Sequence, residues 1–316
     1  MLELPPARDG LHLTRDLTRL GEDRRILGRA VRDGDAVRVR RGVYAAPTAG
    51  VTAEAKALLL MRAVALTAKV PPLFSHRSAA TVWGIPFLTA GAPVAETLIA
   101  AASGGRSGRG IVRRGVDLDA VSVTTVDGFL VTSVERTIID LARTVPFASA
   151  VIAADFALST GGGAREPLTT VDLMMAELAA LGIRRGLARV RRVIDFADGR
   201  SESAGESLSR VRFLELGFPA PELQVEFTHH TGVTDRVDFF WREYGHIGES
   251  DGLGKYRDPG LRGGQSAEDV VIAEKRREDR LRSQQPRFSR WEWRDALAPQ
   301  RLRAILLAAG LPLRAR

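Results

Sequence analysis

The sequence predicts a multidomain protein of mixed α+β and α/β structure. Its 316 residues exceed the usual size of one compact domain, and 45% of them are hydrophobic, so several cores can form. Runs with helical spacing alternate with short period-two runs, and glycines and prolines separate them. We therefore predict a winged helix-turn-helix at 1–48, a middle α+β domain with a helical linker at 49–198, and a C-terminal domain of order α-β-β-β-α-β at 199–316.

Composition excludes several functions. The chain has no cysteine, which excludes a disulfide framework, a cysteine zinc site and a thiol nucleophile. The N-terminus lacks the pattern of a signal peptide, and the longest apolar run, residues 57–70, is interrupted by Arg62 and Lys69. We expect a cytoplasmic protein without a membrane partner. The net charge of +8 favours a nucleic-acid partner, although an arginine-rich coding bias would produce the same excess.

The N-terminal part has the pattern of a DNA-binding unit. Residues 14–20 and 23–33 are two amphipathic helical runs, and a glycine follows each one. This is helix-turn-helix spacing, in which the second helix enters the major groove. Valine alternates with arginine over 37–40 and Arg41-Gly42 is a turn signal, so a basic hairpin follows as the wing. The alternative is a solvated arginine-rich helix that packs on the next domain. The predicted DNA-binding residues are Arg24, Arg25, Arg29, Arg32, Arg38, Arg40 and Arg41.

The middle part mixes helices and strands. A helix begins at Thr52, a second is capped by Ser75, and Asp127-Gly128 is a hairpin turn signal. We expect His76 to be a buried structural residue, because no serine or aspartate partner is recognisable, and Asp140 to pair with an arginine. The last helix carries a basic stripe that either lies on DNA or is a solvated face. The predicted elements are helices at 52–68, 75–84, 133–142, 146–158, 169–181 and 184–197, and strands at 96–102, 110–116 and 121–132.

The C-terminal part carries the sharpest chemical signal. Val237, Phe239 and Trp241 alternate, which predicts that Asp238 points to the other face of its strand. Glu249 and Asp251 are two residues apart and share a face of the next strand. If the two strands pair, these three acids form a carboxylate cluster, which suits Mg²⁺ and is costly without a cation. The predicted elements are helices at 203–216, 266–283 and 298–309, and strands at 222–228, 234–241, 244–250 and 287–291.

A resemblance covers the first half of the chain. The stretch Arg25-Ile-Leu-Gly-Arg-Ala-Val-Arg-Asp-Gly34, followed by Val37-Arg-Val-Arg-Arg-Gly-Val-Tyr44, resembles the winged helix of AbiEi-type antitoxins. Ser75-His-Arg-Ser-Ala-Ala-Thr-Val-Trp-Gly84 and Thr132-Ser-Val-Glu-Arg-Thr-Ile-Ile-Asp-Leu-Ala142 resemble later segments of that family. The resemblance implies a repressor that binds double-stranded operator DNA. It also implies an indirect partner, a nucleotidyltransferase-like toxin.

A second resemblance covers about the last third. The order of elements is similar to the core of PD-(D/E)XK endonucleases. Glu249-Ser-Asp-Gly with Lys255-Tyr256, then Glu274-Lys-Arg-Arg-Glu-Asp-Arg-Leu-Arg282 and Arg290-Trp-Glu-Trp293, resemble the very-short-patch-repair-like branch.

The second resemblance implies site residues. Glu206 would be an accessory acid, Asp238 and Glu249 the metal ligands, and Mg²⁺ the cofactor if the domain is active. Asp251 stands where the family usually has lysine, so Lys255, or Lys275 on the next helix, would supply the positive charge. The alternative is an inactive fold used for binding, in which the acids pair with Arg236, Arg242 or Arg276.

Three functions therefore remain open from the sequence. The first is a DNA-binding regulator of the AbiEi antitoxin type. The second is a Mg²⁺-dependent DNA endonuclease that the winged helix targets. The third is a protein-interaction module that neutralises a toxin through the middle domain.

Overall fold

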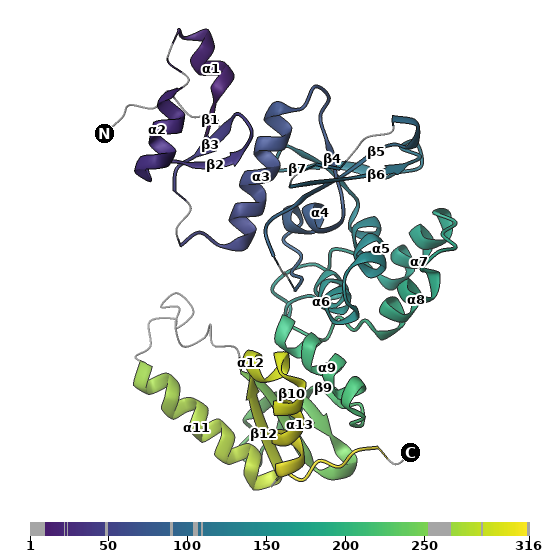
Figure 1. Ribbon diagram of the computed structural model, residues 1–316. Coiled ribbons are helices and arrows are strands. Elements are labelled where there is room, and N and C mark those ends of the chain that lie inside the picture. Colours follow the sequence, from purple (N-terminus) through teal and green to yellow (C-terminus); the bar gives the residue numbers. More distant parts are fainter. Residues whose placement is uncertain are drawn as a thin grey trace. The chain divides into compact units, whose positions relative to one another are not determined.

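The computed structural model describes residues 10–21, 23, 25–47, 50–88, 91–103, 107–108, 110–251, 267–285 and 287–314. The chain is a multidomain α+β protein that divides into two compact units (Figure 1). Unit 1 comprises Met1–Thr144 and Leu173–Arg185, and unit 2 comprises Val145–Asp172 and Gly186–Arg316. The three domain boundaries predicted from the sequence stay a prediction. Two predicted site residues, Arg24 and Lys255, lie outside the described residues.

Unit 1 begins with a small helix-and-sheet module. It contains β1 (Leu11–Leu13), α1 (Thr14–Arg19), α2 (Arg25–Asp33), β2 (Val37–Arg40) and β3 (Val43–Ala45). The strands form an antiparallel sheet of order β1-β3-β2. The two helices and the hairpin are where the sequence predicts them, and Gly42 takes a φ of 77°, which the turn requires. Strand β1 was not predicted, because three residues are too few for a period-two pattern to stand out.

Helix α3 (Ala53–Thr67) contributes side chains to two hydrophobic cores. The predicted cap is confirmed, because the Thr52 hydroxyl accepts a hydrogen bond from the Ala55 N–H at 3.2 Å. Ala63 packs with Leu11, Val43 and other residues of the N-terminal sheet. Leu60 and its neighbours pack with the larger sheet that follows. The helix that opens the predicted middle domain therefore also closes the core of the first module.

The larger sheet of unit 1 has five strands in the order β6-β5-β4-β8-β7. Pairs β4–β8 and β5–β6 are parallel, and the other two are antiparallel. The predicted hairpin is confirmed, since Asp127 and Gly128 have φ values of 48° and 78° between β7 and β8. The elements are β4 (Leu73–Phe74), α4 (His76–Val82), β5 (Ala95–Ala100), η1 (Ala101–Ser103), β6 (Ile111–Val116), β7 (Val123–Val126), β8 (Phe129–Thr132) and α5 (Val134–Thr144).

Unit 2 combines helices with a four-stranded sheet of order β12-β11-β10-β9, in which only the β11–β12 pair is parallel. The predicted order of elements is present, with a further short helix, α12. Ser203 caps α9 by accepting from the Glu206 N–H, and Gly217 ends it with a φ of 79°. Helix α7 (Val171–Ala180) begins in unit 2, and its residues from Leu173 onwards belong to unit 1. The other elements are α6 (Phe147–Leu158), α8 (Leu187–Phe196), α9 (Ala204–Leu216), β9 (Glu222–Thr228), β10 (Thr234–Trp241), η2 (Arg242–Tyr244), β11 (His246–Asp251), α11 (Ala267–Gln284), β12 (Arg287–Glu292), α12 (Trp293–Leu297) and α13 (Pro299–Ala308).

The predicted alternation along β10 is wrong. Val237 packs in one cluster with Phe240 and with Leu281 of α11. Phe239 and Trp241 instead contact the ring of Phe213 on α9, with centroids 5.2 and 5.1 Å apart. The side chains therefore change face between Val237 and Phe239. On the neighbouring strand, Gln224 faces this point with a φ of 53°, and such a local irregularity re-aims side chains in a ladder.

A membrane-spanning helix is not found among the described residues, none of whose helices is both long and apolar enough to cross a bilayer.

Candidate functional site

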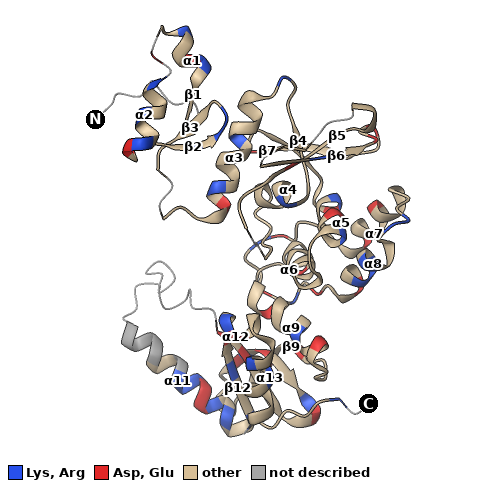
Figure 2. Ribbon diagram, in the orientation of Figure 1, with Lys and Arg blue, Asp and Glu red and all other residues tan. Residues whose placement is uncertain are grey.

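The predicted DNA-binding arginines of unit 1 lie mainly on exposed surface. Helix α2 buries Leu27 and Ala30, while Arg25, Arg29 and Arg32 on the same helix are exposed. Figure 2 marks basic residues on α1, α2 and the β2–β3 hairpin. Two arginines of that hairpin, Arg38 and Arg41, are also exposed. This exposure is what a phosphate contact requires.

Two of these arginines have charged neighbours. Arg29 lies 3.5 Å from Asp23, but both side chains are about half exposed, and such pairs contribute little. Arg40 is half-buried, and its pKa is lowered by burial first and by the charge of Arg113 on β6 second. Val39, beside Arg40, packs on the cluster that contains Ile111. Strand β2 therefore lies against the larger sheet, and positive charge continues from β2 to β6.

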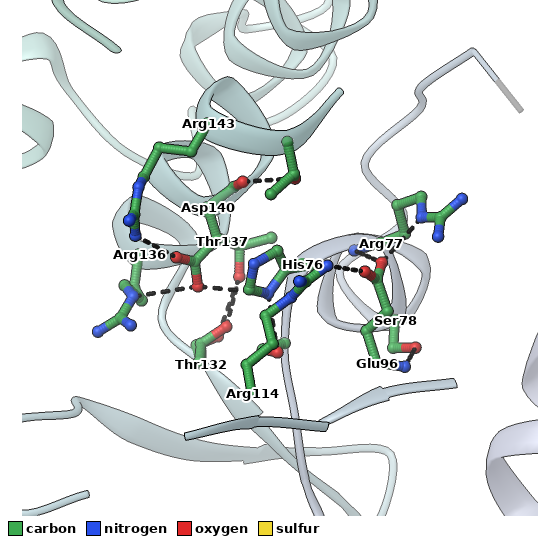
Figure 3. A network of polar contacts seen from close by, with 12 residues as sticks. His76, Arg77, Ser78, Glu96, Arg114, Thr132, Arg136, Thr137, Asp140 and Arg143 are labelled. Carbon is green, nitrogen blue, oxygen red and sulfur yellow. Dashed lines mark hydrogen bonds and ion pairs between the residues drawn. The ribbon is translucent and has the colours of Figure 1, made fainter. Parts of the chain in front are cut away.

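A buried polar network lies between α4, α5 and β5 of unit 1 (Figure 3). Its first centre is Glu96, which is 2% exposed and accepts hydrogen bonds from the Arg77 Nε at 2.8 Å and the Arg114 Nη2 at 2.7 Å. Burial raises the pKa of Glu96, but the hydrogen bond from Arg77 and the nearby positive charges outweigh it and leave the pKa below its ordinary value. Glu96 is therefore a charged structural acid.

The second centre of this network is His76. Its Nδ1 lies 2.9 Å from the Ser75 Oγ and 3.6 Å from the Asp140 Oδ2. The prediction that His76 has no serine or aspartate partner is wrong, because Ser75 precedes it and Asp140 comes from a helix 64 residues further along the chain. Ser75 occupies the N-cap position of α4 as predicted, but its side chain makes no cap hydrogen bond.

This arrangement does not form a nucleophilic triad. In a triad, the serine and the acid meet opposite ring nitrogens, whereas here both meet Nδ1. Burial lowers the pKa of His76, which is only 3% exposed. Asp140 accepts from the Arg136 Nε at 3.1 Å, so its predicted ion pair with an arginine is confirmed. The predicted buried, structural role of His76 agrees with this geometry.

In unit 2, Glu206 is held by polar groups around the start of α9. It accepts from the Ser203 Oγ at 2.7 Å, the Glu202 N–H at 2.9 Å and the Gln224 Nε2 at 2.9 Å. The Ser203 Oγ in turn accepts from the Glu206 N–H, so Ser203 and Glu206 hold each other at the start of the helix. Burial raises the pKa of Glu206, and the hydrogen bonds oppose that rise. Glu206 is thus engaged in contacts that hold the start of α9.

Asp238, Glu249 and Asp251 each make polar contacts with other groups of unit 2. The Asp238 Oδ2 accepts from the backbone N–H of Ser250 at 2.9 Å. Glu249 is 4% exposed, and its carboxylate is bound by Arg277 of α11 and Arg290 of β12. The Asp251 Oδ2 lies 3.5 Å from the Arg290 Nε.

These contacts do not fit a divalent cation. Among the described residues there is no group of three or more histidine, cysteine, aspartate or glutamate side chains that could hold a metal ion. The arginine partners also differ from those named in the sequence analysis, since Arg236 pairs with Glu202 and Arg242 with Glu222. Lys275 is exposed on α11.

One buried acid was missed by sequence reasoning. Asp155 of α6 is fully buried, accepts from the Arg210 Nη1 at 2.6 Å and from the Asp198 N–H at 2.8 Å, and has a pKa raised by burial to about 6. An aspartate in an alanine-rich helix with a distant arginine gives no local signal. The pair joins α6 to α9, so a helix assigned to the predicted middle domain belongs with the C-terminal sheet.

The fold and these sites define a multidomain α+β protein whose N-terminal helix α2 and β2–β3 hairpin carry exposed arginines. No protein-family model matches the chain. It is 32% identical over 217 residues to Uncharacterized protein Rv2248 of Mycobacterium tuberculosis (strain ATCC 25618 / H37Rv), a match that covers 67% of this chain and 72% of the relative. Uncharacterized protein MT2308 of Mycobacterium tuberculosis (strain CDC 1551 / Oshkosh) matches to the same extent. The chain belongs to the same family as these two proteins.

Proposed function

We propose that this protein is a DNA-binding transcriptional regulator of the AbiEi antitoxin type. The observation that carries the proposal is the exposure of the arginines on α2 and on the β2–β3 hairpin, while Leu27 and Ala30 anchor α2 in the core. The second helix of such a module reads the major groove, and the hairpin contacts the phosphates beside it. The DNA bound is the double-stranded region upstream of its own gene, and a nucleotidyltransferase-like toxin is an indirect partner.

An electrophoretic mobility shift with that upstream DNA tests the proposal. The triple variant Arg25→Ala/Arg29→Ala/Arg38→Ala should lose the shift of the wild-type protein. Each phosphate contact adds about 0.9 to the slope of log affinity against log salt, so the variant's slope should be shallower by about 3.

A matched control removes three positive charges from unit 2. Arg242, Arg294 and Arg301 are exposed and paired with acids, so replacing all three by alanine lowers the net charge equally. This control should bind DNA like the wild type. Equal loss of binding in both triple variants would mean that net charge alone drives the interaction, and unchanged binding of the α2 variant would remove the helix-turn-helix from the proposal.

The interpretation of unit 2 as endonuclease-like rests on its topology. Its strands have the order β12-β11-β10-β9 in the sheet, β12 is parallel to β11, and the elements follow each other in the chain as α-β-β-β-α-β. We propose that this fold serves binding, because its acids are paired with arginines. The alternative is Mg²⁺-dependent DNA cleavage. Incubation of plasmid or mismatched DNA with Mg²⁺ or Mn²⁺ decides between them: nicking by the wild type that Asp238→Ala abolishes would establish the nuclease.

A further inference from the structure

Glu249 is a buried carboxylate at the junction of three elements of unit 2. It lies on β11, faces Arg290 in the parallel register with β12, and is 4% exposed. An acid that is removed from water needs a countercharge and hydrogen-bond donors, because leaving it uncompensated is strongly destabilising. In nucleases that use such an acid, a divalent cation provides the countercharge.

Two guanidinium groups surround this carboxylate. Arg277 donates from Nη2 to Oε1 at 2.5 Å and from Nη1 to Oε2 at 3.0 Å, which is the bidentate geometry typical of strong arginine–carboxylate pairs. Arg290 donates from Nη2 to Oε2 at 3.0 Å. Three N–H groups therefore point at the two oxygens of Glu249.

Further contacts fix the two arginines in place. The Arg277 Nη2 also donates to the backbone oxygen of Arg236 at 2.6 Å, which ties α11 to β10. Arg290 lies 3.5 Å from Asp251 and 3.6 Å from Glu278. Their side chains are only 23% and 25% exposed. A divalent cation at Glu249 would have to displace these donors and would then be repelled by two positive charges at close range.

We propose that Arg277 and Arg290 form an arginine clamp that is the permanent counter-cation of Glu249, so that this site fastens α11 and β12 to β11 and takes no divalent metal ion. Asp238 makes a separate contact in this sheet, in which its Oδ2 accepts a hydrogen bond from the Ser250 N–H. The inference does not depend on whether the N-terminal module binds DNA.

Metal uptake by the full-length protein is the first test. Mn²⁺ alone is titrated into the wild type and into Glu249→Gln, and free Mn²⁺ is followed by electron paramagnetic resonance. We expect no stoichiometric uptake that depends on Glu249, and the same thermal midpoint in excess Mg²⁺ as in a chelator. Uptake of one Mn²⁺ per chain that Glu249→Gln abolishes would overturn the clamp.

A double-mutant cycle is the second test. Glu249→Gln and Arg277→Gln should each lower the thermal midpoint by about 5 °C or more, since each removes the charge from one side of this largely buried ion pair. The double variant should lose clearly less than the sum of the two. Arg282→Gln is the matched control on the same helix, because its pair with Glu278 is more exposed, and it should change the midpoint little. Strictly additive losses at Glu249 and Arg277 would contradict the proposed coupling.

Discussion

Asparagine at position 155 would test the electrostatics of the core that joins α6 to α9. Asp155 has a pKa raised by burial from 3.8 to about 6, a difference equivalent to about 3 kcal/mol. Because the folded-state pKa lies above the unfolded-state value, the folded protein holds this proton more tightly. The stabilising effect is fully present below the unfolded-state pKa and is lost as the pH rises through about 6.

Asp155→Asn removes this pH dependence because asparagine does not titrate. It retains an acceptor oxygen for the Asp198 N–H, and Arg210 keeps its hydrogen bond to the Phe196 carbonyl oxygen at 2.7 Å. The change shifts the free energy of unfolding by an amount set by the lost ion pair. This shift is the same at every pH. As the pH rises from about 4.5 to about 7.5, the wild type should in addition lose about 2 kcal/mol of unfolding free energy that the variant does not lose.

Urea unfolding of both proteins at a series of pH values measures this loss. Asp195→Asn, an exposed change on the neighbouring helix α8, is the control and should leave the free energy of unfolding nearly unchanged. If the difference between wild type and Asp155→Asn is the same at every pH, then Asp155 does not titrate as its burial implies, and the reasoning is refuted.

Three further changes test the packing and capping of the two units. Phe213→Ala should cost about 3–5 kcal/mol by urea unfolding, because the ring is 1% exposed and contacts three other aromatic rings; a loss below about 1 kcal/mol would mean that the core repacks. Thr52→Ala should cost about 1 kcal/mol through the lost cap of α3, whereas Thr52→Ser, which keeps the hydroxyl, should not. Glu96→Gln should cost about 2 kcal/mol, since the hydrogen bonds from Arg77 and Arg114 lose their charged acceptor; an unchanged free energy of unfolding would remove Glu96 from the network.

The sequence predicted elements better than it predicted side-chain partners. Local signals such as the Asp127-Gly128 turn and the Ser203 cap located the hairpin and α9, because turn and cap chemistry depends on neighbouring residues. The two-residue strand β4 carries too little pattern to be predicted. The change of face in β10 was also missed, since it accompanies the positive φ of Gln224 on the next strand.

The surroundings of the candidate site residues depend on contacts between residues that are far apart in the sequence. The spacing of Glu249 and Asp251 correctly indicates a shared neighbour, which is Arg290. That neighbour is an arginine 41 residues further along the chain than Glu249, and Arg277 on the preceding helix is 28 residues further along. Hydrophobic periodicity does not predict such long-range pairings. The acids of the C-terminal sheet were therefore found, but their counter-ion was not.

Helix α3 has a consequence for dissecting the protein. Ala63, with the partly buried Leu59 and Leu66, covers Leu11 and Val43 of the N-terminal sheet. A fragment that stops at residue 48 would leave that apolar surface bare in water and should not fold by itself. A fragment made to test the proposed DNA binding should therefore include α3 through Thr67, because failure of a shorter piece to bind would say nothing about the arginines it carries.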